Sequence, residues 1–115
     1  MSAKQVKGLK VFSMSRNGVS ADDMRKMGDF LRDKDQSVVA LMASVNEGKI
    51  TFLAVCGKEA VAKGVKAGDI IKTIAPICGG KGGGKPDSAM GGGADISKVE
   101  EALAAVAGFV QSKLN

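Results

Sequence analysis

A glycine-rich segment in the last third of the chain contains the residue types that phosphate-binding loops use. It reads GGKGGGKPD over residues 79–87, and a second run of glycines follows at residues 91–93. Glycine adopts positive φ at little cost, so consecutive glycines can aim several backbone N–H groups at one anion. Lys81 and Lys85 would add positive charge. We therefore expect a loop that contacts anionic groups through its backbone.

The segment does not match a nucleotide-hydrolysing loop. Gly79, Gly84 and Lys85 have the spacing of the Walker A pattern, but the next residue should be Ser or Thr. It is Pro86, which has neither a hydroxyl for magnesium nor an N–H. The Gly-x-Gly-x-x-Gly fingerprint of dinucleotide binding is also incomplete. A second interpretation is that the glycines let the segment pack tightly against a neighbouring helix or a partner subunit.

The rest of the composition argues against catalysis by this chain alone. It contains no histidine, which removes the commonest general base and the commonest zinc ligand. Its two cysteines, Cys56 and Cys78, lack a metal-type spacing and indicate reduced thiols in a cytoplasmic protein. Four acidic residues could be imagined as a metal site, but Asp87 and Asp95 fit turns better, and residues 100 and 101 fit a helix N-terminus. We expect no metal and no catalytic residue here.

The charge favours an anionic partner. There are 17 Lys and Arg against 12 Asp and Glu, a net charge of +5. The first 16 residues hold no acid, so a basic N-terminal arm (residues 1–7) is a candidate polyanion contact ahead of one domain (residues 8–115). With four phenylalanines and no Trp or Tyr, a base-stacking platform is poorly supported. No apolar stretch is long enough to cross a bilayer, so we expect no membrane contact.

Hydrophobic periodicity predicts an α/β (α+β) fold: one small domain, a central mixed sheet flanked by helices, and a glycine-rich loop before a C-terminal helix. Strands are expected over residues 8–14, 37–45 and 49–56, the last two as an antiparallel hairpin. Helices are expected over 20–34 and 58–63, and a third should carry Ile70, Ile71 and Ile74 and end near Gly79. The last helix should begin with a capping box from Ser97 to Glu100.

The longer pattern GGKGGGKPDSAMGGG at residues 79–93 is more specific than any short motif. With Val65–Asp69 before it and residues 98–106 after it, it closely resembles the C-terminal domain of alanyl-tRNA synthetases, members of the DHH-associated domain family. Many of those have Arg in place of Lys85, which keeps the charge but gives up the planar fork that binds phosphate through two hydrogen bonds.

The resemblance implies a non-catalytic tRNA-binding domain. In that family ATP and zinc are used only by upstream domains, so no cofactor is expected here. The domain would hold the outer corner of tRNA and help to couple aminoacylation to editing of mischarged tRNA. We expect the following residues to contact RNA phosphate or ribose: Lys66, Gly79, Gly80, Lys81, Gly82, Gly83, Gly84 and Lys85.

Two other functions remain open. The chain could be mainly a dimerisation or interaction module, since some members of the family use this domain to form homodimers. It could also be the substrate-binding domain of a DHH-type phosphoesterase, although those usually carry histidine beside the glycines, and Lys85-Pro86-Asp87 here favours the synthetase branch.

Overall fold

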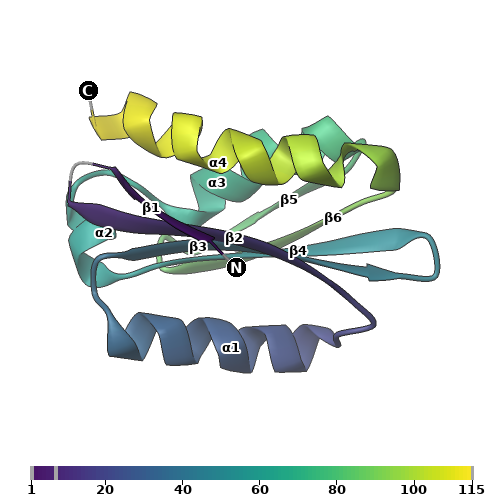
Figure 1. Ribbon diagram of the computed structural model, residues 1–115, viewed down its shortest axis with the longest axis horizontal. Helices are drawn as coiled ribbons and strands as arrows, with labels where there is room; N and C mark the ends of the chain where they lie inside the picture. The colour runs from purple at the N-terminus through teal and green to yellow at the C-terminus, as the bar shows by residue number, and fades with distance from the viewer. Residues whose placement is uncertain (1, 7, 115) are drawn as a thin grey trace.

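The computed structural model describes residues 2–6 and 8–114, with side chains from Gly8 onward, and contains one sheet with helices on both faces (Figure 1). Its strands are β1 (Ser2–Val6), β2 (Leu9–Asn17), β3 (Val38–Asn46), β4 (Lys49–Cys56), β5 (Lys81–Gly84) and β6 (Ser88–Gly93). Its helices are α1 (Ala21–Lys34), α2 (Lys58–Ala62), α3 (Ala67–Ile74) and α4 (Val99–Leu114), with short 3₁₀ turns η1 (Ala75–Cys78) and η2 (Ile96–Lys98). The expected fold class is confirmed. Among the described residues, no helix is long and apolar enough to span a membrane.

The sheet has the strand order β1-β2-β3-β4-β6-β5. Strands β2 and β3 are parallel because α1 crosses over between them, and every other neighbouring pair is antiparallel. The strands and the hairpin expected from periodicity are confirmed as β2, β3 and β4. Residues 2–6, expected to form a separate arm, instead pair with β2 as the edge strand β1, so they belong to the sheet.

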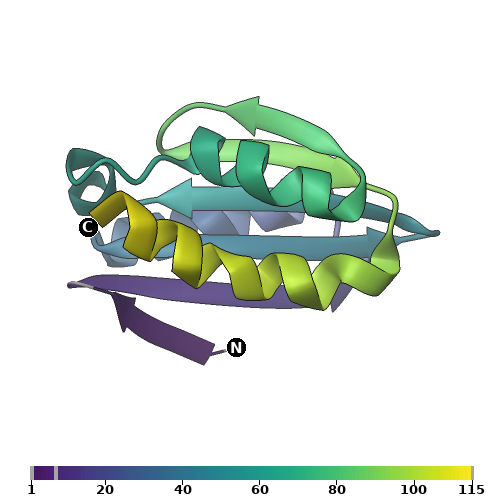
Figure 2. The ribbon, with the colours of Figure 1, turned by 90° about the horizontal axis from the view of Figure 1, so that it is seen from above.

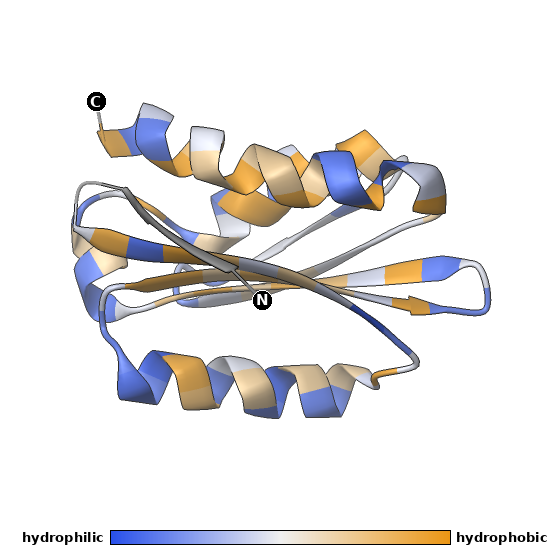
Figure 3. Ribbon diagram, viewed as in Figure 1, coloured by the Kyte–Doolittle hydropathy of each residue, from blue (hydrophilic) through white to orange (hydrophobic). Residues whose placement is uncertain are grey.

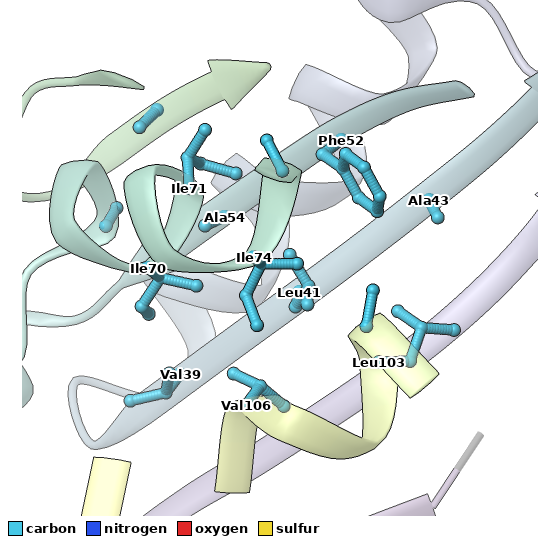
Figure 4. Close-up of a cluster of buried hydrophobic side chains, with 14 of the residues drawn as sticks. Val39, Leu41, Ala43, Phe52, Ala54, Ile70, Ile71, Ile74, Leu103 and Val106 are labelled. Atoms are coloured by element: carbon cyan, nitrogen blue, oxygen red, sulfur yellow. The ribbon is translucent and has the colours of Figure 1, made fainter. Parts of the chain in front are cut away.

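The sheet separates two hydrophobic clusters. Alternate residues of β3 face opposite sides, so Val39 and Leu41 pack toward α3 and α4, whereas Ala40 and Met42 pack toward α1. Figure 2 shows α3 and α4 side by side over one face, and Figure 4 shows the buried side chains between them and the sheet. Because both faces are covered, β3 reads as a continuous apolar run, as expected for a central strand.

Of the two helix caps predicted from the sequence, one is confirmed and the other is wrong. The Ser20 hydroxyl accepts a hydrogen bond from the Asp23 N–H at 3.2 Å, which confirms the expected cap of α1. The predicted capping box at Ser97 is wrong. The Asp95 carboxylate accepts from the Ser97 N–H at 3.2 Å and begins η2, and α4 starts only at Val99. The Ser97 hydroxyl is itself bonded to Asp95, so it is not the cap.

The glycine-rich segment is a β-hairpin rather than the expected loop. Strand β5 pairs with β6 in antiparallel register, and β6 pairs with β4, so the glycines extend the sheet to its last edge. Glycine has no strand preference of its own, so local sequence did not indicate these strands. The expected helix ahead of them is confirmed as α3 with η1, and it ends at Gly79, whose φ is 72°.

Helix α3 packs closely against the hairpin because glycines form the hairpin surface and Gly68 forms part of the helix surface. A Cβ placed on Gly68 of α3 would lie 2.7 Å from the Gly84 carbonyl oxygen. A Cβ on Gly82 or Gly91 would lie 2.7 or 2.6 Å from the Ile71 Cγ2. These distances are shorter than real carbon contacts, so the packing of α3 itself requires glycine at these positions. The second interpretation, tight packing against a helix, is therefore supported.

We expect Gly68→Ala to destabilise the protein by about 1–3 kcal/mol, because its methyl group would collide with backbone that belongs to β5. The matched control is Gly108→Ala in α4, where a Cβ would meet nothing within 4 Å. Alanine is the better helix former, so this control should gain about 0.5–1 kcal/mol. Urea unfolding of both variants measures the two changes. Equal effects would contradict the role assigned to Gly68.

Candidate nucleic-acid interface

The three predicted lysines lie near β5, the last strand of the sheet, and near the start of α3, which packs against it. Lys66 precedes the first residue of α3, Lys81 begins β5 and Lys85 follows it, and all three are exposed. The Ala67 N–H donates to the Pro86 carbonyl at 2.8 Å, which brings Lys66 and Lys85 to the same end of the hairpin. Lys81 lies at the other end, about 13 Å along the strand at 3.3 Å per residue.

A fourth lysine joins this edge. A Cβ on Gly83 would lie 3.4 Å from the Lys72 Cε, so the Lys72 side chain extends from α3 over the middle of β5. Lys72 is not among the residues expected from the sequence to contact RNA. Within residues 8–114, none of Lys66, Lys72, Lys81 and Lys85 forms an ion pair. We call these four residues and β5 the lysine edge.

The backbone of β5 is open on its outer side at Gly82, whereas the Gly84 carbonyl lies against Gly68 of α3. The Lys85 N–H donates to the Ser88 carbonyl at 3.1 Å, which closes the hairpin turn. Hydrogen-bonded and non-bonded pairs alternate along an antiparallel ladder, so the N–H and C=O groups of Gly82 and Gly84 point away from β6. With no side chains to shield them, the groups of the exposed Gly82 are available to a ligand. Figure 3 shows this edge as a pale, glycine-dominated stretch.

The other predicted glycines have structural roles. Gly79 ends η1 in the left-handed region, and Gly80 lies against the Gly92 carbonyl, where a Cβ would overlap it. Together with Lys81, Gly93 and Ala94 they line a shallow hollow of about 410 Å³. The glycines expected to form one anion-binding loop therefore have different positions. Gly79 and Gly80 support the fold, and Gly82 of β5 has exposed backbone.

The hairpin turn is fixed to α1 on the opposite side of the sheet. An Arg32 terminal nitrogen, Nη1, lies 3.1 Å from the Asp87 carboxylate and 3.4 Å from its carbonyl oxygen. The other nitrogen, Nη2, lies 2.8 Å from the Asp29 carboxylate, which holds the guanidinium in place. The Cys56 N–H also donates to the Asp87 carbonyl at 3.0 Å. The turn that follows Lys85 is therefore anchored rather than free.

The N-terminal basic residues lie elsewhere. Strand β1 is at the opposite edge of the sheet from β5, so it does not extend the lysine edge. Lys10 forms an ion pair with Asp35 at 2.8 Å, a contact that raises the Lys10 pKa and, with the hydrogen bonds from Ser37, lowers the Asp35 pKa. The side chains of Lys4 and Lys7 lie outside the described residues.

Both cysteines are buried, and their thiols have raised pKa values. Burial, with a smaller effect from the Asp87 charge, raises the pKa of Cys56 to about 12. Burial also raises the Cys78 pKa, and Asp95 and Glu101 add to the effect. In the part of the chain that the structure describes, no three His, Cys, Asp or Glu residues are grouped to hold a metal ion.

This fold and sequence have relatives among known proteins. The DHHA1 domain model matches residues 5–112. The chain belongs to the DHHA1 domain family. It is 45% identical over 108 residues to the alanine–tRNA ligase of Dehalococcoides mccartyi strain BAV1, and 42% identical over 113 residues to that of Alkaliphilus oremlandii. These matches cover 94% and 98% of this chain but only 12% and 13% of those proteins.

Two solved structures share the DHHA1 fold. The C-Ala domain of Aquifex aeolicus alanyl-tRNA synthetase superimposes with a TM-score of 0.89 at 27% identity, covering 96% of this chain and 99% of that one. A DHH-domain protein described as a member of the s1p family of ribosomal proteins gives 0.65 at 15% identity, covering 96% of this chain and 27% of its own. The second likeness shows the fold alone.

We expect Arg32→Gln to loosen the hairpin turn, because it removes the charged link between α1 and Asp87. Amide hydrogen exchange over residues 85–88 should become several-fold faster, while global stability should fall by about 1 kcal/mol or less, since the Asp87 side chain keeps 55% of its surface exposed. The control is Asp22→Asn, which removes an ion pair of 3.6 Å within α1 and should leave the turn unchanged. Unaltered exchange at the turn in Arg32→Gln would show that Arg32 does not anchor it.

The two thiols should resist alkylation in the folded protein at about pH 8, where an ordinary cysteine is partly thiolate. Burial and the raised pKa values keep Cys56 and Cys78 protonated and out of contact with reagent. Mass spectrometry after iodoacetamide treatment, with and without urea, gives the labelled fraction. Rapid labelling without urea would contradict the buried positions.

Proposed function

We propose that this DHHA1 domain is a non-catalytic tRNA-binding domain of an alanyl-tRNA synthetase. The observation that carries the proposal is the lysine edge, where four lysines without an ion pair to the described side chains surround the three glycines of β5. The identity to alanine–tRNA ligases over nearly the whole chain supports the choice of tRNA as the partner. The domain would act in the cytoplasm, where tRNA is charged.

The edge suits recognition of RNA shape rather than base sequence. Lysine ammonium groups bind phosphates as point charges, and backbone N–H and C=O groups of Gly82 can contact phosphate or ribose hydroxyl oxygens. The edge carries no aromatic ring on which a base could stack. Such contacts hold a tRNA in a defined orientation. In the parent enzyme this would keep one tRNA bound while its acceptor end moves between aminoacylation and editing centres.

Replacing Lys81 and Lys85 together by alanine should weaken tRNA binding and reduce its salt dependence. The slope of log K against log salt is negative, and each lost phosphate contact reduces its absolute value by about 0.7–0.9. Loss of both lysines should therefore reduce the absolute slope by about 1.5. Fluorescence titrations with alanine tRNA over a salt series measure this slope.

The control for that titration is the double variant Lys49→Ala and Lys113→Ala. It removes the same charge from two exposed lysines, at the start of β4 and near the end of α4. Its slope should stay close to that of the unmodified domain. If both double variants have the same affinity and slope, the lysine edge is not the tRNA contact.

A second candidate function is dimerisation through β5. An exposed edge strand with unpaired backbone groups can pair with the same strand of another copy. Sedimentation velocity over a range of protein concentrations tests it, because a dimerisation module associates without RNA. The lysines on both partners would oppose such pairing at low salt, so the observation favours RNA.

A further inference from the structure

The two faces of the sheet are covered unequally. Helices α3 and α4 lie together on one face, whereas α1 alone lies on the other, packed on β3 and β4 (Figure 1). Strand β2 therefore lies beside α1 without a second helix on that face. Among the described pairings, β1 covers the outer edge of β2 only as far as Ser13, so Met14 and Arg16 lie beyond it.

A groove runs between this end of β2 and α1. Its volume is about 440 Å³, and it is lined by Met14, Arg16, Lys26, Met27, Phe30 and Leu31. The floor is apolar, and Phe30 keeps 59% of its surface exposed, the largest value among the big hydrophobic side chains described. Exposing a phenylalanine next to an apolar hollow has a free-energy cost, since its burial would be favourable. We call this feature the Phe30 groove.

The rim of the Phe30 groove is positively charged. Arg16 and Lys26 line it from its two sides, and the Lys34 ammonium lies 5.3 Å from the centre of the Phe30 ring. No acidic side chain lines the groove, and within the described side chains these three cations form no ion pair. A partner that fills the floor with apolar atoms would therefore gain further from negative charge beside them.

We propose that the Phe30 groove docks an acidic amphipathic helix of a partner protein. Leucine-type side chains at positions i and i+4 would enter the hollow, and Glu residues on either side would face Arg16 and Lys26. Methionine side chains such as Met14 and Met27 adapt to such insertions because they are unbranched and flexible. The docked helix would lie beside α1 and complete the second helical layer.

Charge and shape disfavour the other occupants. A second copy of the same face would bring Arg16 and Lys26 against their own duplicates, and like charges across an interface cost free energy. The rest of the apolar lining is Met14, Met27 and Leu31, so the groove offers no second ring for stacking a base and fits aliphatic side chains better. The inference is independent of the tRNA proposal, since the groove and the lysine edge use different residues.

The test uses two synthetic 18-residue helical peptides with identical leucine positions, one flanked by Glu and the other by Lys. The ¹³C-labelled methionine methyl groups of the 115-residue chain report on binding. The Glu peptide should shift the Met14 and Met27 signals and leave the deeply buried Met42 unchanged. The Lys peptide should bind at least about tenfold more weakly, because its charges face the basic rim.

Two protein variants locate the contact. Phe30→Ala and Lys26→Glu should each weaken the Glu peptide by about tenfold, and both residues are exposed enough for the fold to remain. The control is Lys113→Glu, which makes the same charge reversal as Lys26→Glu at an exposed lysine of α4, on the other face of the sheet. It should change affinity less than about twofold.

Three results would overturn the proposal. The first is equal binding of both peptides or no shift at Met14 and Met27. The second is a stronger shift of those signals by a single-stranded RNA 12-mer, which would make the groove an RNA site. The third is a shift with protein concentration alone, which would indicate self-association.

Discussion

The contact between α3 and the glycine hairpin is the constraint on which the rest of this domain depends. The Ile71 side chain packs against Gly82 and Gly91, where a Cβ would collide with its Cγ2. The Gly84 carbonyl oxygen likewise leaves no room for a Cβ on Gly68. This contact brings a helix against the last edge of the sheet. It also places Lys66 and Lys72 beside Lys81 and Lys85, although the two pairs come from different elements.

The same glycines bear on both interpretations of the segment, backbone contact with an anionic partner and tight packing against a helix. Ordering glycine costs more backbone entropy than ordering any other residue, and here the ladder to β6 and the packing of α3 offset that cost. Because Gly82 has no side chain and lies on the edge strand of the sheet, its outward backbone groups are also exposed. The same composition thus allows the packing of α3 and leaves exposed the backbone that the proposed RNA contact uses.

The turn after β5 is held from both sides of the sheet. On one side Ala67 of α3 binds the Pro86 carbonyl, and on the other Arg32 of α1 binds Asp87. A single two-residue turn therefore connects the helical layers and sets the position of Lys85. A rigid support of this kind reduces the entropy lost when a ligand binds, which matters where only a few lysines provide the affinity.

Local patterns in the sequence were sufficient for much of the fold. The apolar run of β3, the hairpin to β4 and the Ser20 cap all depend on neighbours in the chain, and each was predicted. The glycines and lysines of residues 79–93 also single out this segment, and its contact with RNA stays a prediction. The Asp95 cap was missed because Ser97 and Asp95 offered competing acceptors two residues apart.

Long-range contacts decided what local patterns could not. Glycines carry no side-chain signal for a strand, so β5 and β6 become strands only through pairing with β4 and support from α3. Arg32 meets Asp87 across 55 residues, and Lys72 reaches β5 only because α3 packs on it. The sequence by itself determined which residues carry the charge and the flexible backbone. Tertiary structure determined which of them share a surface, since only the packing of distant elements brings their atoms together.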